Sequence, residues 1–159
     1  DLFMQGRFFR LLLVSLMGFS CSLFEAEELP PQWLEASLYG APPLRDILSE
    51  CEAALQASNF PLPFHRDDLE RAVVSGWDVA PHPFSRKGMR SRGIFEVNPL
   101  EKGAWLLRVR VEVEKNDEVH QPLELDSAKW KPMPDDAEVA RIVLQHALTR
   151  LRRAGTRIG

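Results

Sequence analysis

The chain has 159 residues, and its 20 basic residues against 23 acidic ones give a net charge of −3. This balance disfavours nucleic acid as a partner, because the chain carries no global surplus of positive charge. With only two cysteines, the chain lacks the pattern of a disulfide framework. Its length suits one domain behind a leader segment.

Residues 1–21 are typical of an export signal. Arg7 and Arg10 supply a positive n-region, an apolar run over 11–19 follows, and small residues then lead to Cys21. The apolar run is well short of the roughly 20 residues that a transmembrane helix needs. We therefore expect a cleaved signal rather than a permanent span.

The end of this segment resembles the lipobox of bacterial lipoproteins, in which a small residue precedes the cysteine that receives the lipid. Ser20 fits that pattern, whereas Gly18 and Phe19 depart from it. The resemblance implies that the mature chain begins at Cys21 and carries lipid there, which would tether the domain without a spanning helix. A secreted protein with an ordinary cleaved signal and an uncleaved anchor are the alternatives.

Residues 22–43 are expected to form an acidic, proline-rich tether with a short turn over 33–38. Four glutamates, four prolines and no basic residue lie between positions 25 and 43. An apolar cluster within this tether is expected to dock on the domain, because an exposed cluster needs a partner surface. Its members are Trp33, Leu34, Leu38 and Tyr39.

The first expected helix covers residues 44–58. Its apolar residues follow the 3.6-residue period of one helical stripe. They are Leu44, Ile47, Leu48, Cys51 and Leu55. Asn59 suits the left-handed position just after a helix, and Cys51 is interpreted as a small buried hydrophobe.

Short β patterns follow this helix. Residues 60–65 are interrupted by proline and fit only an irregular or edge strand. Residues 71–79 predict a strand with Val73, Trp77 and Val79 on one face, and 90–97 predict another.

The clearest strand is predicted over residues 104–115. Trp105, Leu107, Val109, Val111 and Val113 alternate there with charged side chains and one leucine. This period of two predicts one buried face and one charged face. On the charged face, Arg108 and Arg110 are expected to pair with acidic neighbours.

The last expected helix covers residues 136–152, with Asp135 as its N-cap and Gly155 at its end. Its apolar stripe consists of Ala140, Val143, Leu144, Ala147, Leu148 and Leu151. A C-terminal tail over 154–159 is expected beyond it.

The order of these elements predicts one α+β domain over 44–153. An N-terminal and a C-terminal helix each carry one apolar stripe, and the antiparallel sheet of three to four strands has one apolar face. Both helices are therefore expected on the same face of the sheet, as a two-layer sandwich.

Five stretches carry a resemblance to known proteins: the first helix, AVVSGW, RSRGIFEVNP, AWLLRVRVEVEKN and SAKWKPMPDDAEVARIVLQHALTRL. Over residues 44–151 the chain resembles small bacterial envelope lipoproteins of unassigned function. It is similar in layout to the α+β domains of outer-membrane assembly lipoproteins. The resemblance implies a fold and a compartment, and it carries over no catalytic residue.

One local basic cluster stands out, formed by Arg86, Lys87, Arg90 and Arg92 around Gly88. We expect it in a loop that leads into a strand. It is either a solvated loop or a contact for an anionic polymer, lipid head groups or an acidic partner protein.

Patterns of catalytic or metal chemistry are missing from the sequence. The histidines, at positions 65, 82, 120 and 146, lack the helical spacing of a zinc pair. Neither a nucleophile elbow nor a glycine-rich phosphate loop is present. We expect no enzyme activity, no cofactor and no metal.

These observations favour a membrane-tethered, non-catalytic binding or scaffold lipoprotein of the bacterial cell envelope, on the periplasmic side. Its expected partners are the membrane, through the lipid, and an envelope protein or anionic polymer. The alternative is an exported small-ligand or lipid-binding module with an apolar site between helices and sheet. Such a site needs unfilled apolar space between helices and sheet, and the large residues of the chain could fill that space instead. These residues are Trp77, Phe95, Trp105 and Trp130.

Overall fold

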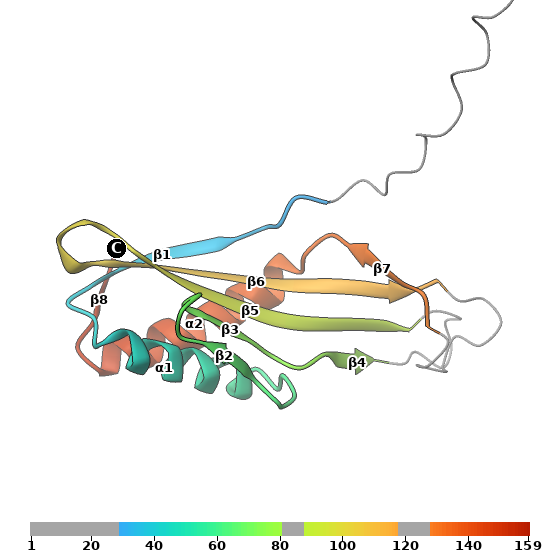
Figure 1. The fold of residues 1–159 in the computed structure, drawn as a ribbon, viewed down its shortest axis with the longest axis horizontal. Coiled ribbons are helices and arrows are strands. Elements are labelled where there is room, and N and C mark those ends of the chain that lie inside the picture. The colour runs from blue at the N-terminus through green and yellow to red at the C-terminus, as the bar shows by residue number, and fades with distance from the viewer. Residues whose placement is uncertain (1–28, 81–87, 118–127) are drawn as a thin grey trace, which may run out of the picture.

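The computed structural model describes residues 29–80, 88–117 and 128–159. In this part of the chain, helices α1 (Leu44–Ala57) and α2 (Ala137–Arg153) lie on one side of an antiparallel sheet (Figure 1). The α+β class is therefore confirmed. The export segment with Cys21 lies outside the described residues, as do Arg86 and Lys87.

The sheet is larger than the predicted three to four strands, since the described residues alone form eight. The strands are β1 (Leu34–Tyr39), β2 (His65–Asp67), β3 (Ala72–Val74), β4 (Asp78–Ala80), β5 (Met89–Pro99), β6 (Trp105–Asn116), β7 (Trp130–Met133) and β8 (Arg157–Ile158). Their order is β2-β3-β5-β6-β1-β8, with β4 beside β5 and β7 beside β6. Among the additional strands, β4, β7 and β8 have only two to four residues, so they leave little periodic signal in the sequence.

A long hairpin of β5 and β6 forms the centre of the sheet, and the two strands pair along their full length from Met89 opposite Lys115 to Pro99 opposite Trp105. A short 3-10 helix, η1 (Glu101–Gly103), connects them. Lys102 and Gly103 both have positive φ, at 57° and 72°, which lets the chain reverse within a few residues.

The segment expected to turn over 33–38 forms strand β1 instead. It pairs with β6 on one side, where Leu34 lies opposite Val109, and with β8 on the other. Of the apolar cluster expected to dock, Leu38 is fully buried and Leu34 packs against the core, whereas Tyr39 is 44% exposed. Apolar and polar residues alternate from Leu34 to Leu38, and this period of two is the pattern of a strand rather than of a turn.

Residues 71–79 form two strands rather than one. The chain bends between β3 and β4, where the backbone N–H of Gly76 donates to the Pro61 carbonyl at 3.0 Å. Ser75 follows β3 and bonds to β5, because its hydroxyl accepts the backbone N–H of Gly93 at 2.9 Å. The bend lets β3 and β4 pair with different parts of the long β5 strand.

A single apolar core fills the space between the helices and the sheet. The predicted stripe of α1 is buried there except for Leu44, which is partly buried. From α2 the core takes Ala140, Val143, Ala147 and Leu151. From the sheet it takes Leu38, Val73, Phe95, Val97, Leu107, Val109 and Val111. At Gly93 a Cβ would lie 2.3 Å from Leu55 Cδ2, so a larger residue there would displace the Leu55 side chain from its place in the core.

Helix α2 is capped by Asp136 rather than by Asp135. The Asp136 side chain accepts hydrogen bonds from the backbone N–H groups of Glu138 and Val139, at 3.1 and 2.9 Å. Asp135 is therefore not the capping residue. Its side chain contacts other groups on the sheet face that points away from the helices.

Candidate binding face

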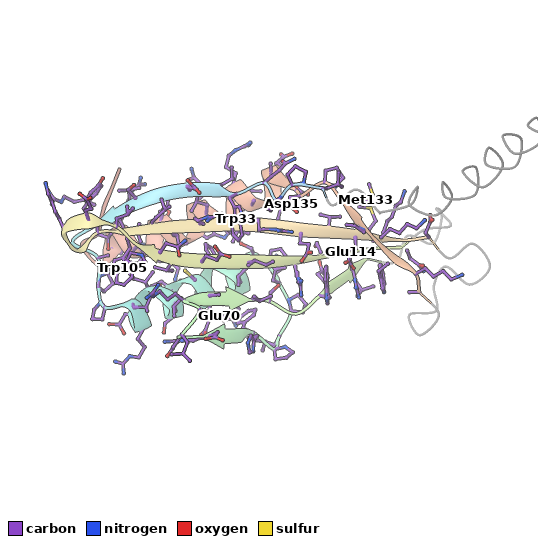
Figure 2. The ribbon with its side chains drawn as sticks, turned by 45° about the horizontal axis from the view of Figure 1, so that its top comes forward. Trp33, Glu70, Trp105, Glu114, Met133 and Asp135 are labelled. Carbon is purple, nitrogen blue, oxygen red and sulfur yellow. The ribbon has the colours of Figure 1, made fainter. Side chains whose placement is uncertain are left out.

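The sheet face that points away from the helices carries an ordered array of charged and aromatic side chains (Figure 2). We call this surface the open face. Its residues are Trp33, Glu35, Trp77, Arg90, Arg92, Glu96, Arg108, Arg110, Glu112, Glu114, Trp130 and Asp135. Strand β6 supplies its central row, since the residues that alternate with the buried valines point outward.

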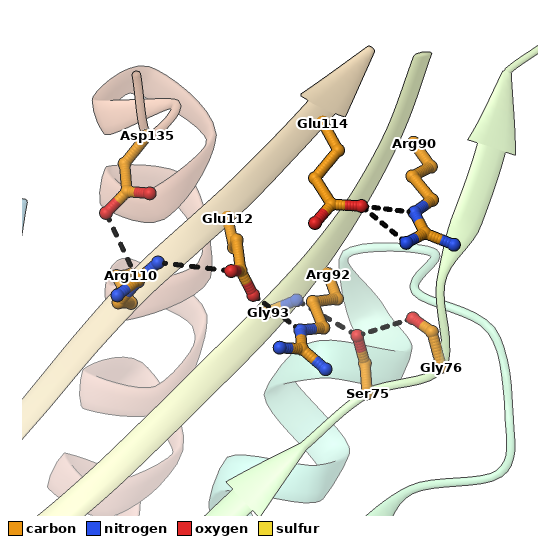
Figure 3. A network of polar contacts seen from close by, with 9 residues as sticks. All are labelled: Ser75, Gly76, Arg90, Arg92, Gly93, Arg110, Glu112, Glu114 and Asp135. Carbon is orange, nitrogen blue, oxygen red and sulfur yellow. Dashed lines mark hydrogen bonds and ion pairs between the residues drawn. The ribbon is translucent and has the colours of Figure 1, made fainter. Parts of the chain in front are cut away.

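Two arginines of β5 pair with glutamates directly opposite them on β6. Arg90 Nε donates to Glu114 Oε2 at 2.6 Å, and Arg92 Nε donates to Glu112 Oε2 at 2.6 Å (Figure 3). The strand register itself places each arginine beside its acid. Charged pairs in this cross-strand arrangement are favourable, and here the side chains are also partly buried.

The network continues along β6 to the start of α2. Arg110 lies 3.6 Å from Glu112 Oε1, and its Nε lies 3.2 Å from Asp135 Oδ2. The Asp135 side chain is only 5% exposed and also accepts the backbone N–H of Gln32 at 2.8 Å. Asp135 therefore joins three segments: the chain before β1, the centre of β6 and the start of α2.

A second group of charges lies where β1 meets β6. Arg108 Nε lies 3.3 Å from Glu35 Oε1, and Arg108 Nη1 lies 3.8 Å from Glu96 Oε2. The Nε atoms of Arg108 and Arg110 are buried, and they face these carboxylates without a well-oriented hydrogen bond. Both guanidinium groups are thus held by ion pairing and packing more than by directed bonds.

Indole rings stack on the guanidinium groups at both ends of the array. The guanidinium carbon of Arg90 lies 4.2 Å from the ring centroid of Trp77 and 4.3 Å from that of Trp130. At the other end, the guanidinium of Arg108 lies 4.4 Å from the ring of Trp33. Each such stack contributes roughly 0.5–2 kcal/mol.

Of the predicted basic cluster, the structure describes Arg90 and Arg92, and it places both in a strand rather than in a loop. Arg90 and Arg92 belong to strand β5 and lie on the open face, each beside a glutamate. From the sequence, Trp33 is expected in the apolar docking cluster, and Trp77 and Trp130 are expected to fill the core. None of the three is predicted to stack on an arginine. Of the large residues considered for the core, Phe95 is fully buried there.

The described residues hold no group of three or more histidine, cysteine or acidic side chains that could bind a metal ion. Burial of Cys51 within α1 raises the pKa of its thiol far above the ordinary range. His146 lies near the end of α1, where its Nδ1 is 3.0 Å from the Ser58 hydroxyl.

Within the described part of the chain, none of the helices has the length and apolar character to cross a membrane.

No protein-family model matches this chain, and no curated protein matches it significantly.

Proposed function

We propose that this chain is a membrane-tethered, non-catalytic binding or scaffold lipoprotein of the bacterial cell envelope, with Cys21 as the lipidated residue. In this proposal the open face is the surface that binds the partner. The export pattern of residues 1–21 supports the tether, and the composition of the open face supports the binding role.

The observation that carries the binding role is the concentration of tryptophan and arginine on the open face. These residue types are enriched at the energetic centres of protein–protein interfaces. Strands β5 and β6 have 11 and 12 residues, so the face is about 35–40 Å long at roughly 3.3 Å per residue. Across four strands this gives an area of several hundred Å², similar to the roughly 800 Å² that each partner contributes to a stable interface.

The charges of this face favour a protein over a polyanion. Its arginines already lie beside glutamates or Asp135, so the surface offers both signs of charge in fixed positions. Such preorganised side chains lose little conformational freedom on binding. An envelope protein with complementary rows of charge fits this surface better than an anionic polymer does.

The alternative of a lipid or small ligand between helices and sheet has no specific support among the described residues. Their side chains fill that space as one core cluster.

The tether is tested by membrane fractionation of the chain and its Cys21→Ser variant in a bacterial host. We expect the unaltered chain in the membrane fraction with a mass that includes lipid, and the variant in the soluble fraction. Equal partitioning of the two would contradict the lipoprotein proposal.

The binding face is tested with a photo-crosslinking amino acid at Ile94, which lies opposite Arg110 on the open face. The matched control is Ile142, which is 50% exposed on α2. We expect a discrete crosslinked complex from position 94, lost when Trp77 and Trp130 are replaced by alanine. A complex that forms equally from position 142, or that survives the tryptophan replacements, would contradict the proposal.

A further inference from the structure

At one end of the sheet, three neighbouring strands each contribute one residue to a row of two cations and one methionine. Met89 of β5 lies opposite Lys115 of β6, which in turn lies opposite Lys131 of β7. We call these three residues the Met–Lys row. Partners in an antiparallel ladder point to the same side of the sheet, so the three side chains lie next to one another.

The helices do not extend over this row. The backbone N–H of Asp136, at the start of α2, donates to the Val111 carbonyl, so the helix begins well before Lys115 along β6. Met89 is 37% exposed, and the Lys131 side chain is 61% exposed. The row is therefore accessible on the same side of the sheet as the helices, beyond their ends.

Among the described residues, the row has a surplus of positive charge. Like charges directly opposite each other in a sheet are unfavourable, and here one acid, Asp117, lies 2.5 Å from Lys131 Nζ. Lysine stems are apolar along their length, and methionine adapts to irregular apolar surroundings. A cationic row with an apolar member complements the anionic head groups of a membrane surface.

The direction of β1 brings the tether to the same end of the molecule. Because β1 runs antiparallel to β6 with Leu34 opposite Val109, the residues before Leu34 run toward the end of β6 that pairs with β7. The bond from Gln32 to Asp135 holds the chain on this course. Figure 1 shows the described chain leaving β1 in that direction.

The length of the tether limits how far this end can move from the bilayer. From Cys21 to Leu29, the chain spans at most about 28 Å at roughly 3.5 Å per residue. That is shorter than the β5–β6 hairpin, which is about 35–40 Å long. A lipid on Cys21 would therefore keep the Met–Lys row near the head groups, where even a weak contact is favoured by its high effective concentration.

We propose that the Met–Lys row contacts the anionic head groups of the membrane that holds the lipid. The sheet then stands on the bilayer with the η1 turn farthest from it. This inference rests on the proposed lipidation of Cys21. The tether keeps this end of the sheet close to the bilayer, and the two lysines of the row set the orientation within that reach.

Lipid-borne quenchers can measure this orientation. The full chain carries an encoded fluorescent amino acid at Pro132 in β7 or at Glu101 in η1, and it is reconstituted into vesicles with and without anionic lipid. A second preparation has a synthetic lipid coupled to the Cys21 thiol, so the orientation is measured even where the cell adds no lipid. The buried Cys51 thiol stays unreactive in that coupling.

We expect quenching at position 132 to exceed that at position 101 severalfold on anionic vesicles. In Lys115→Ser/Lys131→Ser the excess should disappear, whereas the control Arg152→Ser/Arg153→Ser should retain it. Equal quenching at the two positions would overturn the inference. An excess that persists in the lysine variant would also overturn it, because the tether alone would then set the orientation.

Discussion

The two faces of strand β6 are built from adjacent residues and have opposite chemistry. Leu107, Val109 and Val111 point into the core and are almost completely buried. Arg108 and Arg110, between them, point outward into a network of acids and indoles. Burial of the apolar face explains why the domain folds. Charged side chains on the open face could be solvated individually, yet here they form ordered ion pairs and ring contacts.

The two faces of the sheet differ in how much they contribute to stability. Isolated surface ion pairs contribute little to the free energy of unfolding, so most of the stability of the domain comes from the apolar core. The open face nevertheless holds its arginines between carboxylates and rings at defined distances. Substitutions on the buried face should therefore lower the free energy of unfolding much more than substitutions on the open face.

The largest expected effect comes from breaking the buried face. Val111→Asp places an unpaired charge in the core and should lower the free energy of unfolding by about 4 kcal/mol or more, or prevent folding. On the open face, Glu96→Ala should cost less than about 1 kcal/mol. Chemical denaturation of both variants measures the difference, and similar losses would show that the assigned faces of the hairpin are wrong.

A smaller effect is expected where the open face is tied to α2. Asp135→Ala removes the acceptor of the Gln32 N–H and the carboxylate beside Arg110, and should cost about 1–3 kcal/mol. Hydrogen exchange at Gln32 should accelerate. Asp136→Ala serves as the control, because loss of the α2 cap should cost about 1 kcal/mol without faster exchange at Gln32.

The indole stacks should show a measurable coupling. A double-mutant cycle that replaces Arg90 and Trp130 with alanine should give a coupling energy of about 0.5–2 kcal/mol. The same cycle for Arg90 and Trp33, at opposite ends of the array, should give a value near zero. A coupling near zero for the first pair would mean that the stack contributes no stability.

The smallest effect is expected at the turn between β2 and β3. Backbone N–H bonds from Glu70 and Leu69 lower the pKa of Asp67. A lowered pKa in the folded state means that the charged carboxylate stabilises the fold above the ordinary aspartate pKa, and that this contribution fades as the pH falls through the folded pKa. The stability difference between the protein and Asp67→Ala should therefore be small near neutral pH and shrink further in acid. A difference that grows in acid would contradict the assignment.

The sequence predicted the parts of the fold that have strong periodicity. Both helices were found within a residue or so of their observed bounds, and the two faces of β6 were assigned from alternation alone. The short strands β7 and β8 were missed, because two to four residues cannot display a period. The prolines and acids that flank β1 are typical of a tether, and for this reason the sequence predicts a turn rather than a strand there.

The open face could be predicted only in part. The charges of β6 were assigned to an exposed face, yet their aromatic partners come from distant segments. Trp33 precedes β1, and Trp130 begins β7, a strand that the sequence did not reveal. Stacking across such separations depends on the strand order and register, which a single sequence does not specify.

Footprinting of the tryptophans can show whether a partner covers the open face. Hydroxyl-radical modification of Trp33, Trp77 and Trp130 is compared between the chain in its native membranes and the purified chain in detergent, with Ile142 on α2 as the reference. We expect the three indoles to be protected in native membranes while modification of Ile142 stays unchanged. Equal modification of the indoles in both preparations would contradict a binding role for the open face.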